Sequence, residues 1–528
     1  MKKRIIYTAF VLMTSFIITS CTGDLDLVPR ESFSSAKVYN DADNYVNVLA
    51  KIYGGLVLSG NEGPAGNPDI ADIDEGFSPY LRVFWNLQEI PTDEAVCGWN
   101  DTGIPELNTM TWGSSNSFVK AMYSRLFFQI TLCNEFIRES SQENMDRRGF
   151  SAEDQARITK YRAEARFLRA LSWYHALDLF GNVPFMTEED GIGAFTPEQT
   201  NRADLYAYVE SELIAIEADL LEPKTNEYAR VDKAAAWFLL AQLYLNSEVY
   251  IGEGKWSECA SQCEKIINAG YSLHPNYEGL FLADNHTSPE VIMPLACDGL
   301  YTQSYGNMTF LVHAFIGGSM DADEFGVNGG WAGYRATKAY TDTYIEQTDT
   351  ATDSRFIYHL DGQKQSVDTI GLFSNGWAQA KYKNVTSTGE AGSDGTGNFV
   401  DTDFPLMRLA EVYLMYAECA VNGGADLGQA ANYVNELRER AYGNASGNIT
   451  SGDLNADFIL NERGIELSWE GKRRTDLIRF GKFTSGNYLW EHKGDVPTGT
   501  GVGEHLILYP LSADDIVANP NLTQNPGY

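Results

Sequence analysis

A single tryptophan stands in a polar loop of the chain, within the stretch VCGWND at residues 96–101. The flanking segments EIPTDEA and TGIPELNT lack the helical or strand period that usually accompanies a buried tryptophan. An indole in such a loop offers a large, rigid apolar plane, which suits stacking on the C–H face of a pyranose. We expect the small Gly98 to leave that ring face open. The alternative is that Trp99 anchors the loop in the core.

Acidic residues are numerous, but they form no recognised catalytic motif. Because Asp and Glu total 72, a pair of carboxylates at glycosidase spacing is expected by chance. Asp72-x-Asp74 does not continue as an EF-hand loop, and no H-E-x-x-H, G-x-S-x-G or P-loop motif occurs. His175 lies among apolar residues of a predicted helix, so we expect it in the core. These features argue against an enzyme.

Two further groups of charged residues have ordinary structural explanations. In DTDFP, Asp401 and Asp403 could bind calcium together with Asp284, although solvated carboxylates are the simpler expectation and no cofactor is predicted. The segment WEGKRRTDLIRFG carries three arginines near three acidic residues: Arg473, Arg474 and Arg479 near Glu466, Glu470 and Asp476. We expect an ion-pair network on a helix face, with an anion site as the alternative.

The composition limits the partners of this 528-residue chain. Its formal net charge of −33 repels nucleic acid and anionic lipid surfaces, while neutral ligands remain open. Six cysteines follow Cys21: Cys97, Cys133, Cys259, Cys263, Cys297 and Cys419. None has zinc-site spacing, so we expect small buried residues.

The N-terminus resembles a bacterial lipoprotein signal. A basic start precedes the apolar stretch 5–18, and I-T-S-C ends at Cys21. We expect residues 1–20 to be a signal peptide, Cys21 to be lipidated and residues 21–40 to be a tether; an ordinary signal with a chance cysteine is the alternative. Asp24 and Asp26 resemble the acidic export signal of surface lipoproteins in Bacteroidetes-type bacteria. No later stretch reaches about 18 apolar residues, so we expect the rest to be soluble.

Apolar residues at helical spacing predict a mainly α fold. The predicted helices fall within the segments 44–56, 117–140, 161–181, 232–250, 256–270, 408–424, 426–443 and 460–481. Trp237, Leu240, Ala241 and Tyr244 follow tetratricopeptide spacing, with Ala in place of Gly. Long Gly-, Asn- and Asp-rich segments at 60–116 and 300–405 interrupt the helices, and loops of this length are usually functional.

Four stretches together resemble the SusD/RagB family. They are RAEARFLRALSWYHALDLFGNVPF, DTDFPLMRLAEVYLMYAECAVNGG, NERGIELSWEGKRRTDLIRFG and YPLSADDIVANPNLTQNPGY. The resemblance implies a lipid-anchored protein on the outer membrane surface, in which tetratricopeptide-like helix pairs pack against an irregular ligand-binding half. Such proteins are not enzymes; they bind oligosaccharides and cap a SusC-like TonB-dependent transporter. It further implies a single unit over residues 41–528, with an N-terminal part at about 41–270 and a C-terminal part at about 271–528.

The resemblance is closer to the starch-binding member of the family than to the family average. It places Asp74 and Arg82 on hydrogen-bonding positions and three aromatics on stacking positions: Trp99, Tyr305 and Trp331. A binding asparagine after the tryptophan is replaced here by Asp101-Thr102, with Asn100 beside it. Asp74 and Arg82 could alternatively form a structural salt bridge. The expected ligand is a starch-like α-glucan; the alternatives are another glycan or glycopeptide, or a transporter lid with little affinity of its own.

Overall fold

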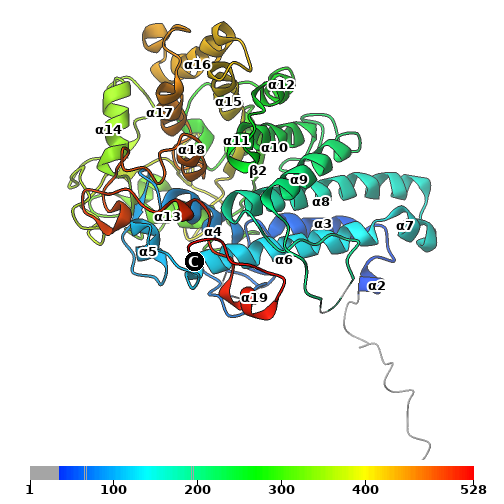
Figure 1. Cartoon of the computed structure of the whole chain (residues 1–528). Coiled ribbons are helices and arrows are strands. Elements are labelled where there is room, and N and C mark those ends of the chain that lie inside the picture. Colours follow the sequence, from blue (N-terminus) through cyan, green and yellow to red (C-terminus); the bar gives the residue numbers. More distant parts are fainter. Residues whose placement is uncertain (1–34, 65, 67, 192, 194) are drawn as a thin grey trace, which may run out of the picture. The chain divides into compact units, whose positions relative to one another are not determined.

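The computed structural model describes residues 35–64, 66, 68–191, 193 and 195–528 (Figure 1). The expected signal peptide, Cys21, Asp24 and Asp26 lie outside the described residues. The described residues divide into two compact units, with 35–46 in the first and those from 47 onward in the second. In the first, α2 spans Ser35–Val38, and α3 (Asn44–Gly54) begins there. Among the described residues, no helix combines the length and apolar character needed to cross a membrane.

The larger unit is mainly helical, as expected from the periodicity. Its N-terminal helices are α4 (Tyr80–Glu89), α5 (Ile104–Thr109), α6 (Ser117–Glu139), α7 (Gln142–Arg148), α8 (Ala152–Leu179), α9 (Arg202–Ile216), α10 (Lys233–Leu245), α11 (Ser247–Ile251) and α12 (Trp256–Ile267). The C-terminal helices are α13 (Met308–Ala314), α14 (Lys338–Gln347), α15 (Leu409–Val421), α16 (Leu427–Tyr442), α17 (Ala456–Glu466), α18 (Arg473–Arg479) and α19 (Ala513–Ala518).

Side-chain caps set the starts of several helices. Asn116, Ser151, Asp232 and Asp426 each accept backbone N–H groups at the first turn of α6, α8, α10 and α16. The Ser151 cap explains why α8 begins nine residues before the predicted segment 161–181. The predicted helical region 460–481 contains parts of two helices, because the left-handed backbone at Trp469 (φ 60°) and Gly471 (φ 73°) separates α17 from α18.

Helices that are close in the sequence pack together in the larger unit, and α12 also packs on the distant α15. Contacts join α6 to α8, α8 to α9, α10 to α12, α12 to α15 and α15 to α16 (Figure 1). Small buried side chains such as Ala241 and Ala417 lie on α10 and α15 and allow close approach of these helices. The six cysteines after Cys21 are all buried and free, which confirms that they are small core residues.

The arginines near the C-terminus form the expected ion-pair network, but it is buried and, apart from the Asp476–Arg479 pair within α18, it joins separate elements. They pair with acidic residues far away in the sequence: Arg473 with Asp93 at 2.7 Å, Arg474 with Asp178 at 3.2 Å and Arg479 with Glu418 at 2.5 Å. Glu466 and Glu470 both contact Arg408, each at 2.7 Å. Asp476 pairs with Arg463 and Arg479, each at 2.8 Å. Since each arginine is committed to a carboxylate, this arrangement disfavours an anion site.

Three short antiparallel ladders connect the irregular segments. β2 (Val291–Leu295) pairs with β6 (Phe404–Arg408), and β4 (Tyr358–His359) pairs with β5 (Ala378–Gln379). β1 (Val96–Cys97) pairs with β3 (Tyr334–Arg335) in the register Val96↔Arg335 and Cys97↔Tyr334. This last ladder joins the two long loop segments in which Trp99 and Trp331 lie.

Candidate functional site

The β1–β3 ladder brings two tryptophans together. Trp99 lies two residues after β1, and Trp331 lies three residues before β3. The Trp99 indole Nε1 donates a hydrogen bond of 2.9 Å to the Trp331 carbonyl oxygen, and the ring centroids are 6.3 Å apart at 51°. Gly98 N–H donates to the Gly333 carbonyl at 2.9 Å and extends the ladder. Both rings are half-buried, so each retains exposed surface.

Each residue of the segment 331–333 donates a backbone hydrogen bond to the segment 313–316. Trp331 N–H donates to His313 O at 2.8 Å, Ala332 N–H to Ile316 O at 2.9 Å and Gly333 N–H to Ala314 O at 2.7 Å. The His313 ring stacks on Trp331 with centroids 4.8 Å apart and planes at 16°. Ala332 has a left-handed backbone (φ 49°), a conformation that costs energy for residues other than glycine and that clusters at functional sites. The indole is therefore positioned before any ligand binds.

Tyr305 extends the two tryptophans into a continuous row. Its ring centroid is 6.3 Å from that of Trp331, at 56°, and 5.4 Å from that of Phe399. The Asn398 side-chain amide donates to the Tyr305 hydroxyl at 3.3 Å. We call Trp99, Trp331 and Tyr305 the aromatic row. The structure thus brings together the three stacking residues expected from the sequence.

Arg82 of α4 lies beside the aromatic row. Its guanidinium carbon is 5.5 Å from the Trp99 ring centroid, within cation–π range. Its Nη1 donates to Gly76 O at 2.9 Å and to Tyr305 O at 3.0 Å. Its Nε is buried and has no hydrogen-bond partner within the described part of the chain. Buried donors are normally satisfied, so a buried water is the expected partner of this atom.

Asp74 is connected to Arg82 through the backbone of Gly76. Its Oδ1 accepts the Gly76 N–H at 2.8 Å, while the Gly76 carbonyl accepts from Arg82. The salt bridge considered from the sequence is not among the ion pairs of the described residues. Asp74 is exposed, as are Asn100 and Asp101, which follow Trp99 directly. These three polar side chains are therefore accessible from solvent.

The two glycines beside the tryptophans allow close packing. A Cβ on Gly98 would lie 2.8 Å from Arg335 Nη1 and 3.1 Å from Ile370 O, so close packing requires glycine here. That Gly98 also leaves the Trp99 ring face open stays a prediction. A Cβ on Gly333 would lie 2.4 Å from Cε2 and Cζ2 of Trp99, so the indole packs directly on this backbone.

Sequence reasoning missed the residues that support the row. His313, Ala332 and Asn398 position rings without any recognisable motif of their own. The Gly-rich stretch NGGWAG at 328–333 was the one available signal, because glycines mark places where backbones approach closely.

The aspartates considered for calcium accept hydrogen bonds from nearby loops. Asp284 accepts from Ser387 N and Oγ at 2.9 and 2.6 Å, and Asp401 accepts from Gly299 N at 2.7 Å. Asp403 accepts from Cys297 N at 2.7 Å, and burial raises its pKa to about 6. No group of three or more His, Cys, Asp or Glu residues able to hold a metal occurs within the described ranges. The structure therefore does not support the calcium site.

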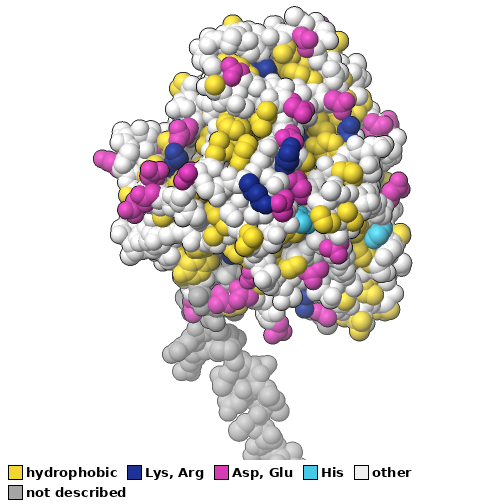
Figure 2. Space-filling model, turned by 90° about the vertical axis from the view of Figure 1, so that its left-hand side faces the viewer, with side chains coloured by type: hydrophobic (Ala, Val, Ile, Leu, Met, Phe, Trp, Pro, Cys, Tyr) yellow, Lys and Arg dark blue, Asp and Glu magenta, His cyan; other side chains and the backbone are white. Residues whose placement is uncertain are grey.

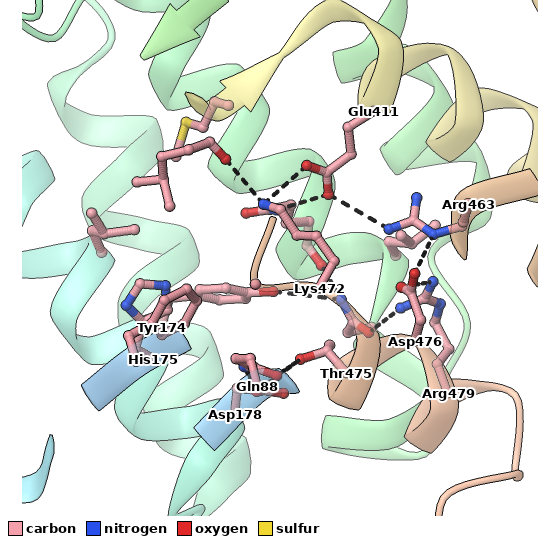
Figure 3. A pocket seen from close by; sticks show the side chains of 18 residues that line it. Gln88, Tyr174, His175, Asp178, Glu411, Arg463, Lys472, Thr475, Asp476 and Arg479 are labelled. Carbon is pink, nitrogen blue, oxygen red and sulfur yellow. Dashed lines mark hydrogen bonds and ion pairs between the residues drawn. The ribbon is translucent and has the colours of Figure 1, made fainter. Parts of the chain in front are cut away.

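His175 lines a small cavity among α4, α8, α10, α15, α17 and α18 (Figure 3). The cavity leaves about 30 Å³ for the centres of water molecules, which is room for little more than water. Lys472 pairs with Glu411 at 3.0 Å, so this cation is already neutralised. The His175 ring nitrogen Nδ1 is 2.6 Å from the Tyr80 hydroxyl, and burial lowers the pKa of His175 to about 3. His175 is thus a neutral core residue, as expected.

Comparison with known proteins gives consistent matches. Residues 336–528 match the model described as the SusD family. The chain is 33% identical to the "Starch-binding protein SusD" of Bacteroides thetaiotaomicron, over 100% of this chain and 99% of that protein. It is 27% identical to "SusD-like protein P2" of Formosa agariphila, over 80% and 83% of the two chains.

Solved structures share the fold at lower identity. A SusD superfamily protein from Parabacteroides distasonis superposes with a TM-score of 0.70 at 20% identity, covering 94% of this chain and 100% of that chain. "Surface glycan-binding protein A" from Bacteroides fluxus gives a TM-score of 0.68 at 19% identity, covering 92% and 99%.

Proposed function

Since this chain belongs to the SusD family, we propose that it captures glycan on the aromatic row, and that the ligand is a starch-like α-glucan. The chain is accordingly a binding protein and not an enzyme. The 33% identical relative is by its name a starch-binding protein, and a relative in fold is by its name a surface glycan-binding protein. Both names support a carbohydrate ligand for this chain.

The geometry of the aromatic row is the observation that carries this proposal. Three half-buried rings follow one another at 6.3 Å, and neighbouring ring planes are inclined by 51° and 56°. A row of inclined platforms suits a chain of pyranoses that curves from one residue to the next, as α-1,4-linked glucose does. Because hydrogen bonds hold the Trp99 and Tyr305 rings and the His313 stack holds Trp331, little conformational entropy is lost on binding.

Polar groups around the row supply partners for the hydroxyl rim of a sugar. The Arg82 guanidinium lies beside Trp99 and carries several N–H donors. Asp74 and Asp101 offer carboxylate acceptors, and Asn100 offers both a donor and an acceptor. We propose that these four residues hydrogen-bond the glycan while the row stacks against its C–H faces.

The remaining parts of the proposal follow from the family and the N-terminal sequence. We propose that residues 1–20 are removed, that Cys21 is acylated and that the protein is displayed on the outer membrane with a SusC-like TonB-dependent transporter as partner. We also propose that residues 41–528 act as one ligand-binding unit on tetratricopeptide-like helix pairs. Mass spectrometry of the mature N-terminus checks the acylation, and co-purification under native conditions checks the partner.

Affinity electrophoresis tests the ligand directly. The purified protein should migrate more slowly in gels containing starch or pullulan than in blank gels. Dextran, xylan and inulin gels serve as controls for linkage and sugar type. Equal migration in all gels would contradict glycan capture and favour a transporter lid, whereas retardation in another polymer alone would replace the α-glucan by that glycan.

A further inference from the structure

A second tyrosine lies exposed on the turn that leads into the aromatic row. In the stretch DGLYTQSYG, Tyr301 precedes Tyr305 by four residues. Its side chain is 83% exposed, and the neighbouring Leu300 is 52% exposed. Tyr301 is not among the residues that the sequence predicts to bind ligand.

Hydrogen bonds within residues 298–302 close the turn that carries Tyr301. The Asp298 carboxylate Oδ1 accepts the N–H groups of Leu300 at 2.8 Å and Tyr301 at 2.9 Å. Thr302 N–H donates to the Asp298 carbonyl at 3.0 Å, and Asp298 N–H donates to Thr302 Oγ1 at 2.6 Å. The exposed ring therefore stands on a closed turn and not on a loose loop.

The same turn is fastened to the segment that supports Tyr305. Gly299 N–H donates to Asp401 Oδ1 at 2.7 Å, and a Cβ on Gly299 would lie 3.1 Å from the Phe399 carbonyl oxygen. Phe399 also contacts the Tyr305 ring. Asn307 Nδ2 closes the other end of the turn with a 2.6 Å hydrogen bond to Thr302 O. Tyr301 and Tyr305 are thus held by one common framework.

The distance between the two tyrosines is within reach of an oligosaccharide. Four residues of fully extended chain span at most about 14 Å, and a closed turn spans less. A tyrosine ring combines an apolar face with a polar tip, and it has few rotamers to lose. A rigid, exposed ring at this distance is suited to a sugar unit that lies beyond the end of the row.

We propose that Tyr301 contacts the same glycan outside the aromatic row and makes the affinity depend on chain length. This inference rests on the proposed function, because it requires a glycan on the row. A trisaccharide is accommodated by the three rings alone, while a longer chain also meets Tyr301. The added contact selects polymers and long oligosaccharides over short ones.

Calorimetric titration of the purified protein with maltotriose and maltoheptaose tests the proposal. Tyr301→Ala should weaken maltoheptaose binding by about tenfold, equivalent to about 1.4 kcal/mol. Maltotriose binding should stay within about twofold of the original protein. Tyr301→Phe keeps the ring and should behave like the original protein. Leu300→Ala removes a neighbouring exposed side chain from the same turn and serves as the matched control.

The outcomes separate this inference from the proposed function. If Tyr301→Ala binds both sugars like the original protein, while Trp99→Ala loses both, the inference is overturned and the glycan site stands. Equal weakening of both sugars by Tyr301→Ala also overturns it, since the residue would then act on the row itself. If the original protein binds neither sugar, the proposed α-glucan ligand fails and this inference fails with it. Thermal melts of each variant show that the fold is kept.

Discussion

Trp99 is intermediate between an exposed residue and a core residue. Its indole N–H donates a hydrogen bond to the Trp331 carbonyl oxygen, and one side of the ring packs on Gly333. The sequence correctly selects it as unusual, because a tryptophan in a polar loop has no helical or strand period around it. The sequence does not show that Trp99 packs on the loop of Trp331, because this contact depends on strand pairing between residues more than 230 positions apart.

Truncating Trp99 should reduce affinity much more than stability. Trp99→Ala should weaken binding of a long α-glucan oligosaccharide by a factor of roughly thirty, because an aromatic anchor contributes about 2 kcal/mol and each 1.4 kcal/mol is tenfold. Since the ring is half-buried, the melting temperature should also fall by a few degrees. Calorimetric titration and thermal melts on the same preparation measure both effects.

A fully buried tryptophan provides the matched control. Trp85 of α4 is 0% exposed, so Trp85→Ala should cost about 3–5 kcal/mol of stability and lower the melting temperature far more. If Trp99→Ala destabilises the protein as much as Trp85→Ala does, Trp99 is a core anchor and no longer a binding residue.

At the scale of elements, periodicity predicts the long helices well and the short ladders poorly. α10, α12, α15 and α16 each lie within a predicted segment, because their apolar residues recur at helical spacing. β1 and β3 have two residues each, too few to show an alternating pattern. The sequence also predicted the ion-pair network around α17 and α18 but not most of its partners. Charges at i, i+3 and i+4 suggest pairs within a helix, as Asp476 and Arg479 form, whereas tertiary packing pairs the other charges with distant strands, loops and helices.

The buried carboxylate Glu466 offers a test of that network. It contacts Arg408 at 2.7 Å and also pairs with Arg355 and Arg440, and these arginines hold its pKa at about 2, below the ordinary value of 4.5. Glu466→Gln removes the charge and leaves buried guanidinium groups under-compensated, so it should be strongly destabilising at pH 7, by about 3 kcal/mol or more.

The pH dependence gives the sign of this contribution. A carboxyl with a lowered folded-state pKa stabilises the fold fully above its unfolded pKa, and the stabilisation is lost as the pH falls toward the folded value. The difference in unfolding free energy between the original protein and Glu466→Gln should therefore shrink as the pH falls from about 4.5 toward 2. Urea titrations at several pH values measure it. The exposed Glu253→Gln should show a difference near zero throughout, and a pH-independent effect of Glu466→Gln would contradict the proposed charge pairing.

At the scale of the whole molecule, the surface charge distinguishes classes of ligand. The chain carries a net charge of −33, and acidic side chains are spread over the face in Figure 2, where Lys and Arg side chains are fewer. Such a surface is unfavourable for anionic polysaccharides and indifferent to neutral ones. The composition alone therefore disfavours an anionic ligand, whereas the linkage depends on the geometry of the aromatic row.

This distinction predicts that glucan binding is insensitive to salt. A neutral glucan has no charge to be screened, so its dissociation constant should change by less than about twofold between low and high sodium chloride, even though the Debye length falls from about 30 Å at 0.01 M to about 3 Å at 1 M. Titrations of maltoheptaose at both salt concentrations measure the effect, and Trp99→Ala shows that the signal comes from the row. A maltoheptaose affinity that changes steeply with salt, in either direction, would mean that ionic interactions within the protein control the binding site. That result would contradict capture by the aromatic row and uncharged hydrogen bonds alone.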